Sequence, residues 1–284
     1  NYSSESLGLL IGIVFVCAGL AFKVSAVPFH MWTPDVYQGA PTPITGFFAL
    51  APKIAAMGLL VRFLFNSFGE IYADWQQIII FISIASMVFA AFAAIAQTNI
   101  KRLMAYSSIG HVGFGLIGIA CVSNEGLRSL IIYLMIYLVM NIAVFSFILS
   151  MKRKDEYFEN ISDLSGLYKN HPFASVMISL TMFSLAGIPP LAGFFGKFYI
   201  FMAAIESNMF ILSIIGVLAS VVGAFYYLRI VKIIYFDEPQ ERYDGFSIKS
   251  LNILFYPSSM LIALFCFYPS PVIDVATFTI KSFL

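Results

Sequence analysis

The chain has 284 residues, of which 60% are hydrophobic and 11% charged, with a formal net charge of +1 and a mean hydropathy of +0.90. A soluble domain of this length could not bury so much apolar surface, so the composition excludes a soluble protein and indicates an integral membrane protein. The three cysteines, Cys17, Cys121 and Cys266, lie in separate apolar runs without metal-ligand spacing, which is typical of packing residues.

Apolar runs in the sequence approach the ~20 residues that a helix needs to cross a bilayer. They predict an all-α membrane protein with about eight transmembrane helices. The predicted spans are residues 6–25, 43–65, 76–96, 103–122, 128–150, 174–205, 209–234 and 251–270, followed by a short tail.

Basic residues in the connections predict an orientation, because Lys and Arg accumulate on the cytoplasmic side of a membrane. Alternate connections carry ten of them: Lys101, Arg102, Lys152, Arg153, Lys154, Lys169, Arg229, Lys232, Arg242 and Lys249. The opposite side carries three: Arg62, Arg128 and Lys281. The charges therefore predict that the chain starts and ends on the outer side.

Three further lysines, Lys23, Lys53 and Lys197, fall inside apolar segments. A charged side chain at a helix centre costs ~2.5 to 3.5 kcal/mol on insertion scales, so such residues are rare unless they have a function. Lys53 lies ~15 Å from the end of its span, beyond the reach of a snorkelling side chain, whereas Lys23 lies nearer an end. Every acidic residue can be placed in a loop or near a span end, so no carboxylate in the sequence obviously neutralises these lysines.

Two of the predicted spans are interrupted near a lysine. Pro28 follows Lys23 and disfavours helix at the preceding residue, while "SLAGIPPLAGFFGKFYIF" places Gly187, Pro189 and Pro190 ahead of Lys197. Irregular backbone at membrane depth is tolerated where it lines a wet cavity or is buried in protein. A pair of broken helices with lysines favours a transport site over two simple proline kinks.

The chemistry that suits this pattern is proton transfer. Burial disfavours the charged form of an amine, so a row of such groups joined by water can pass protons along. His111, within the fourth span, is a candidate member of the row, with a hydrogen-bonded structural role as the alternative. His30, in the segment after Pro28, is a candidate gate or a structural clamp.

Several motifs of other function classes are missing from the sequence. There is no phosphate-binding loop, no dinucleotide fingerprint after a strand and no cluster of metal ligands. The glycines of "GHVGFGLIG" are typical of close helix packing in a membrane. We expect no cofactor, no metal site and no nucleic-acid partner in this chain.

Four stretches carry a resemblance to a known family: "FKVSAVPFHMWTPDVYQGAPTP", "APKIAAMGLLVRF", "QTNIKRLMAYSSIGHVGFGLIG" and "LAGIPPLAGFFGKFYIF". They resemble the antiporter-like membrane subunits of proton-pumping NADH–quinone oxidoreductase, respiratory complex I, over nearly the whole chain. "PFHMWTPDVYQGAPTP" is similar to the N-type subunits (subunit 2 in mitochondria) rather than to the L and M types, which have a "HTWLPDA"-like pattern. Lys197 also differs from the glutamate of the M type, and the chain is too short for the lateral helix of the L type.

The resemblance implies a fourteen-helix fold of two inverted repeats, of which this chain would be a C-terminal fragment holding helices seven to fourteen. Residues 1–66 would end the first repeat, 76–234 would form the second, and 251–284 would be the last helix and tail. It implies that Lys23 and Lys197 lie at discontinuous helices and that Lys53 is the central relay. A glutamate that pairs with the Lys23 position would lie outside this chain, which alone should not pump protons.

The resemblance also implies partners and a location. Other complex I membrane subunits, the lipid bilayer and the missing N-terminal half would surround the chain, while FMN, iron–sulfur clusters and quinone would lie in other subunits. The bacterial inner membrane is the expected location, with an organelle inner membrane as the alternative. Two rival functions are a subunit of a multi-protein sodium/proton antiporter or membrane-bound hydrogenase, and a structural membrane subunit whose lysines are relics.

Overall fold

The computed structural model describes residues 4–153, 156–239, 243–244, 246 and 248–283; Lys154 and Arg242, two of the predicted loop charges, lie outside them. Almost all the described elements are helices. Those elements are α1 (Ser4–Val24), α2 (Trp32–Gly39), α3 (Thr42–Arg62), α4 (Tyr72–Ile95), α5 (Ile100–Ala120), α6 (Asn124–Ser150), β1 (Lys152–Arg153), β2 (Glu156–Tyr157), α7 (Leu167–Asn170), α8 (Pro172–Ala186), α9 (Ala192–Glu206), α10 (Phe210–Phe236), α11 (Lys249–Leu264) and α12 (Ser270–Phe283).

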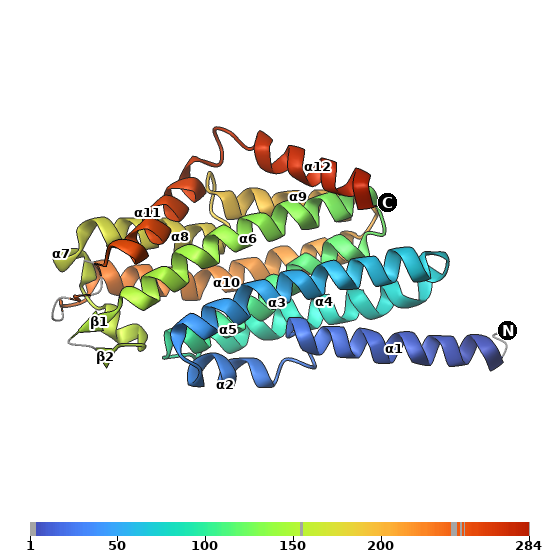
Figure 1. Cartoon of the computed structure of the whole chain (residues 1–284), viewed down its shortest axis with the longest axis horizontal. Coiled ribbons are helices and arrows are strands. Elements are labelled where there is room, and N and C mark those ends of the chain that lie inside the picture. The colour runs from blue at the N-terminus through green and yellow to red at the C-terminus, as the bar shows by residue number, and fades with distance from the viewer. Residues whose placement is uncertain (1–3, 154–155, 240–242, 245, 247, 284) are drawn as a thin grey trace.

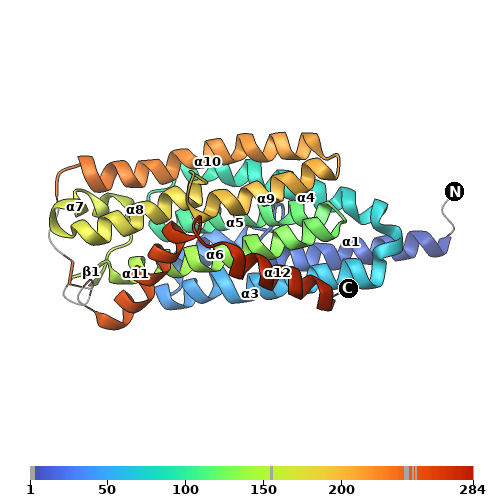
Figure 2. The ribbon, with the colours of Figure 1, turned by 90° about the horizontal axis from the view of Figure 1, so that it is seen from above.

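The long helices lie side by side along one axis, and both chain termini lie at the same end of the bundle (Figures 1 and 2). Within the described part of the chain, five helical segments are long and apolar enough to cross a membrane, and shorter apolar helices accompany them. The loop charges separate as predicted, because β1, α7 and the start of α11 lie at the end opposite the termini (Figure 1). The prediction of an all-α membrane protein with alternating spans is confirmed.

Both predicted helix breaks are present. The helix α1 ends at Val24, where Ser25 takes a left-handed conformation (φ 67°), and α2 begins only at Trp32. The predicted sixth span consists of α8 and α9, separated by residues 187–191, with Gly187 left-handed at φ 89°. A left-handed residue after the last turn is the usual way to end a helix, and glycine adopts it without steric cost.

The last predicted span differs from the structure. Residues 251–270 were expected as one helix followed by a tail, but α11 ends at Leu264 and the supposed tail forms α12. Pro269 and Pro271 interrupt the helical pattern. Beyond them Ala276 and Ile280 are buried, and α12 packs against α6, so a second helix forms where the sequence seemed too short for a span.

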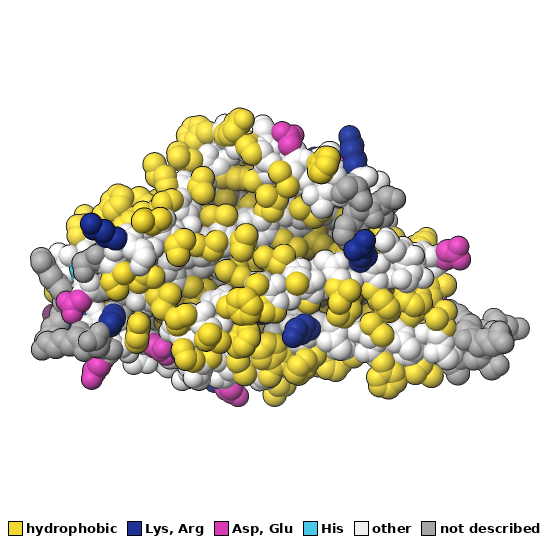
Figure 3. Space-filling view, viewed as in Figure 1, with side chains coloured by type: hydrophobic (Ala, Val, Ile, Leu, Met, Phe, Trp, Pro, Cys, Tyr) yellow, Lys and Arg dark blue, Asp and Glu magenta, His cyan; other side chains and the backbone are white. Residues whose placement is uncertain are grey.

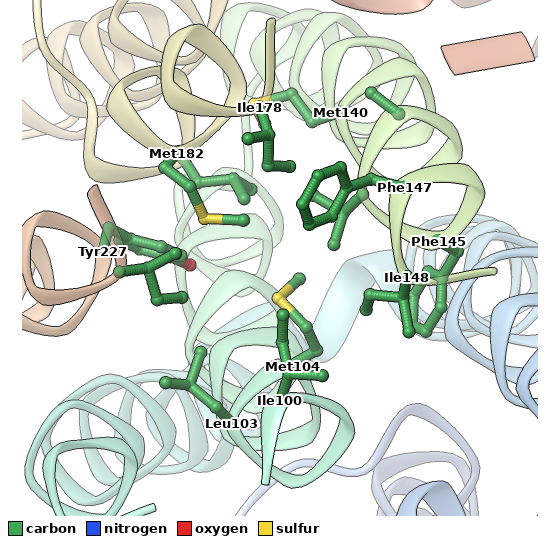
Figure 4. Packing of buried hydrophobic residues seen from close by; sticks show 14 of the residues in the cluster. Ile100, Leu103, Met104, Met140, Phe145, Phe147, Ile148, Ile178, Met182 and Tyr227 are labelled. Carbon is green, nitrogen blue, oxygen red and sulfur yellow. The ribbon is translucent and has the colours of Figure 1, made fainter. Parts of the chain in front are cut away.

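The core lies between α5, α6, α8 and α10, where apolar side chains from all four helices meet (Figure 4). The helix α5 is the central one, since nearly all of its residues are buried. Its glycines allow this: a Cβ at Gly113 would meet Met87 of α4, and one at Gly118 would meet the backbone of α6 at Gly126. The prediction that these glycines serve helix packing is confirmed.

Candidate functional site

Lys53 lies in the middle of α3 with only 2% of its surface exposed. Its Nζ donates a hydrogen bond to Ser108 Oγ on α5 at 2.5 Å and lies 5.3 Å from the centre of the Tyr37 ring of α2. Pro52 precedes it inside the helix and cannot donate a backbone hydrogen bond. The predicted burial of Lys53 is confirmed, and among the described residues its hydrogen-bond partner is a hydroxyl group, not a carboxylate.

Ser108 joins Lys53 to a third helix. The Tyr137 hydroxyl of α6 donates to Ser108 Oγ at 2.9 Å, so this oxygen receives hydrogen bonds from both the lysine and the tyrosine. A serine hydroxyl has two acceptor lone pairs and one proton of its own. Ser108 can therefore receive both donors and still donate, which is what a proton-relay group requires.

His111 follows Ser108 by one helical turn and is buried. Its Nδ1 lies 2.6 Å from the Tyr133 hydroxyl of α6, and its Nε2 lies 3.2 Å from the Tyr227 hydroxyl of α10. The Tyr227 hydroxyl also lies 2.5 Å from Ser107 Oγ. In neutral imidazole one nitrogen donates and the other accepts, so His111 can connect hydroxyls on opposite sides of α5.

Lys197 of α9 is also buried, and its contacts explain why the break lies beside it. Its Nζ donates to the carbonyls of Leu185 at 3.1 Å and Ala186 at 2.9 Å, and to Ser220 Oγ of α10 at 2.8 Å. The last carbonyls of a helix lack partners within the helix and carry the negative end of its dipole. By ending at Ala186, α8 thus supplies a site for a cation, and a Cβ at Gly187 would lie 3.0 Å from the lysine chain.

A small cavity separates His111 from Lys197. Both residues line it, together with Ser107, Ser220 and Tyr227. The cavity has a volume of about 10 Å³, which is close to the smallest space that can hold one water molecule. The hydroxyl and imidazole groups around it offer the polar partners that a buried water needs. A hydrogen-bonded row thus extends from Lys53 through Ser108 and Tyr137, and another from His111 through Tyr227 to the cavity beside Lys197.

The structure separates Lys23 and His30 from this row. The Lys23 side chain is exposed in the last turn of α1 and forms no hydrogen bond or ion pair with the residues that the structure describes. His30 is buried with its ring 4.6 Å from that of Phe89 on α4, and its Nδ1 has no hydrogen-bond partner in the described part of the chain. The packing of His30 agrees with a clamp, while its role as a gate stays a prediction.

The sequence reading missed the hydroxyl groups of this site. The missed residues are Tyr133, Tyr137, Tyr227, Ser107, Ser108 and Ser220. A signal was present, because Tyr133 and Tyr137 are four residues apart in α6 and Ser107, Ser108 and His111 share a face of α5. Polar residues that recur on one face of an apolar span therefore predict a hydrogen-bonded row from the sequence alone.

Similarity to known proteins identifies the family to which the chain belongs. The family described as "NADH:quinone oxidoreductase/Mrp antiporter, TM" matches residues 1–223. The chain belongs to this family. It is 59% identical over 279 residues to NADH-quinone oxidoreductase subunit N of Parvibaculum lavamentivorans, covering 98% of this chain and 58% of that protein. The predicted similarity to the N-type subunits is confirmed, and the chain spans little more than half the length of such relatives.

Solved structures also show that the chain has an antiporter-like fold. A chain of respiratory complex I from Thermus thermophilus, with bound aureothin, superposes with a TM-score of 0.76 at 30% identity, over 90% of this chain and 56% of that one. A chain of the Mrp complex from a Dietzia species superposes with a TM-score of 0.85 at 19% identity, over 99% and 60%. The curated relatives are bacterial, and the chain is a multi-pass protein of the bacterial plasma membrane, as predicted.

Proposed function

We propose that this chain forms the proton-conducting part of a membrane subunit of NADH–quinone oxidoreductase. The observation that carries the proposal is the pair of buried lysines, Lys53 and Lys197, each beside a row of hydroxyl or imidazole groups, with the rings of Tyr137 and His111, one from each row, 5.0 Å apart. Each member can both hold and release a proton. The residues come from α3, α5, α6, α9 and α10.

In this proposal the Lys53 ammonium gives a proton to Ser108 Oγ while the Ser108 hydroxyl reorients to donate its own proton to Tyr137, which first turns its own hydroxyl away from Ser108. A side-chain movement brings Tyr137 within hydrogen-bond distance of His111, whose ring centre lies 5.0 Å from that of Tyr137. His111 and Tyr227 then pass the proton to the cavity and to Lys197. The carbonyls at the end of α8 stabilise the ammonium form of Lys197, and Ser220 offers it a route onward. Reorientation of a hydroxyl or imidazole resets each link for the next proton. A water in the cavity completes the connection between His111 and Lys197.

Lys23 has a different role in the proposal, because it lies on the surface of the described chain. We assign it as the residue whose charge responds to an acidic partner outside this chain. The energy comes from NADH oxidation and quinone reduction in other subunits, which hold the redox groups. Among the described residues, no cluster of His, Cys, Asp or Glu side chains could hold a metal ion.

Sodium/proton antiport is the second candidate, since the Mrp complex shares the fold. That likeness is at 19% identity and supports the fold alone, whereas the relatives above 50% identity are named as NADH-quinone oxidoreductase subunits. The proposal therefore favours the oxidoreductase.

The proposal is tested by replacing Lys197 with methionine in the full-length subunit within the complex. Vesicles containing this complex should translocate fewer protons per NADH oxidised. A matched control is Lys232→Met, which removes an exposed lysine that pairs with Asp237. Equal proton yields for the two variants in assembled complex would contradict the proposal, and a yield that depends on sodium would favour the antiporter.

A further inference from the structure

Both buried lysines lie over the face of an aromatic ring. The Nζ of Lys197 lies 5.0 Å from the centre of the Phe114 ring on α5, and the Nζ of Lys53 lies 5.3 Å from the centre of the Tyr37 ring on α2. Both distances are within the ~6 Å over which the electron-rich face of a ring attracts a cation. The two lysines thus have a neighbour of the same chemical kind, although they come from different helices.

Neither lysine forms an ion pair with a carboxylate in the described part of the chain. Their hydrogen bonds go to two serine hydroxyls and to the carbonyls at the end of α8. Hydrophobic side chains cover most of the face of the molecule that Figure 3 shows, and Lys53 and Lys197 have only 2% and 7% of their surfaces exposed. Water therefore solvates neither ammonium well, and a ring attracts a cation most strongly when the cation has lost its water.

The Phe114 ring is held in place by its own neighbours. It is buried, and the ring of Phe201 on α9 packs almost perpendicular to it, at 83° and with the ring centres 6.1 Å apart. The ring of His111, one turn earlier in α5, has its centre 6.2 Å from that of Phe114. Phe114 also lines the small cavity beside Lys197. The ring therefore borders both the imidazole and the lysine between which the proposed proton path passes.

The helices that pack on α9 bring no other group that would balance a charge on Lys197. Those helices are α5, α6, α8, α10 and α11, and their only acidic residue is Glu125, in the first turn of α6. The titratable groups around the cavity are His111 of α5 with its partner Tyr133 of α6, and Tyr226 and Tyr227 of α10. Tyrosine is neutral near pH 7, and a protonated His111 would repel the ammonium.

We propose that Phe114 is a positioning residue, whose ring keeps Lys197 in its ammonium form beside Ser220 and the end of α8. The ring takes the place of a carboxylate and attracts the ammonium more weakly than a carboxylate would, so the lysine can still release its proton. Tyr37 repeats this arrangement at Lys53. The inference rests on the proposed function, because it concerns the proton held by Lys197 during transfer.

The test replaces Phe114, in the full-length subunit within the complex, by phenylalanine that carries one, two or three ring fluorines. Fluorine withdraws electrons from the face of the ring and changes its size little, so each fluorine weakens the attraction and the proton leaves Lys197 at a lower pH. The pH at which the proton yield per NADH falls to half should decrease by about 0.3 unit for each fluorine. Phe114→Leu, which has no ring, should decrease it by about one unit.

The matched control is the same fluorine series at Phe147. That ring is buried against Phe246 and Phe255, and no lysine or arginine among the described residues lies over it. Fluorination of Phe147 should leave the pH profile unchanged. An equal shift in both series would mean that fluorine acts through packing, and it would overturn the inference.

Lys197→Met separates failure of this inference from failure of the proposed function. If Lys197→Met lowers the proton yield but the pH profile does not move with the number of fluorines on Phe114, the role of the ring is overturned and the proposed function stands. If Lys197→Met leaves the yield unchanged, both are contradicted. A shift that grows with each fluorine on Phe114, together with a loss of yield in Lys197→Met, is the result that we expect.

Discussion

The amine of Lys53 on α3 and the hydroxyl of Tyr137 on α6 donate to the same oxygen, Ser108 Oγ on α5, and the three helices pack against one another. Lys53 is the residue that the sequence marks most clearly as unusual. The shared acceptor connects it with α5 and α6, and the sequence does not predict this contact. It also explains how a lysine can be buried without a carboxylate among its hydrogen-bond partners. The proton path that we propose passes from Lys53 through this oxygen.

Ser108→Ala should reduce the protons translocated per NADH, because it removes the link between Lys53 and the remainder of the row. Two buried donors lose their acceptor, and we expect a stability loss of about 1–3 kcal/mol. Proton uptake and thermal unfolding of the purified complex measure the two effects. Ser129→Ala is the matched control, since the hydroxyl of that buried serine donates to the backbone carbonyl of Gly126 and to no side chain among the described residues. Similar proton yields in both variants would count against Ser108 as a relay.

His111→Phe should interrupt transfer between Tyr133 and Tyr227, because phenylalanine fills similar space without ring nitrogens. Tyr133 and Tyr227 would each lose one hydrogen bond, and Tyr227 would keep its contact with Ser107. The proton yield should fall while NADH oxidation by the other subunits continues in uncoupled vesicles. His171→Gln is the comparison, since His171 lies in the connection before α8 and accepts from the Tyr243 amide. A normal yield for His111→Phe would show that its role is structural.

Gly193→Ala should displace α9, and Lys197 with it. The Gly193 amide donates to Ser184 Oγ at 2.9 Å, and an added Cβ would overlap the Ser184 carbonyl oxygen. We expect a destabilisation of about 1–3 kcal/mol and less assembled complex, as measured by native gel electrophoresis. Gly12→Ala adds the same methyl group where no atom lies within 4 Å. If both variants assembled alike, the close approach of α8 and α9 would not be needed.

Glu159→Gln should loosen the junction between α2 and α5. Lys101 is buried, pairs with Glu159 at 2.6 Å and donates to the carbonyl of Ala40 at 2.9 Å. Glu159 is partly exposed, so we expect a loss of about 1–3 kcal/mol, less than for a fully buried pair. Thermal unfolding of the complex measures it, with Glu125→Gln, which breaks the exposed pair with Arg128, as the control. Equal shifts would contradict the importance of burial.

The sequence predicts those features that depend on local pattern. The lengths of the apolar runs give the long helices, and Pro28 and Gly187 locate the two breaks. Lys53 and Lys197 are identified because a buried charge is costly in any membrane segment. The separation of the basic loops also follows from composition, since it needs no knowledge of packing.

The features that the sequence does not predict depend on which helices meet. The sequence predicts Lys101 as a loop charge, yet its side chain is buried because the segment that contains Glu159 packs against it. The contact between Ser108 and Tyr137 joins residues 29 positions apart. Lys23 reads as a member of the buried set but is exposed here. The helix α12 was missed because burial of Ala276 against α6, rather than span length, stabilises it.

Lys53→Met in the full-length subunit tests the central claim most directly. The measurement is the number of protons translocated per NADH oxidised by vesicles containing the complex, with assembly checked in the same preparation. We predict a large loss of translocated protons in fully assembled complex, because methionine keeps the volume of the side chain but cannot carry a proton. An unchanged yield would contradict the account and leave Lys53 as a structural residue.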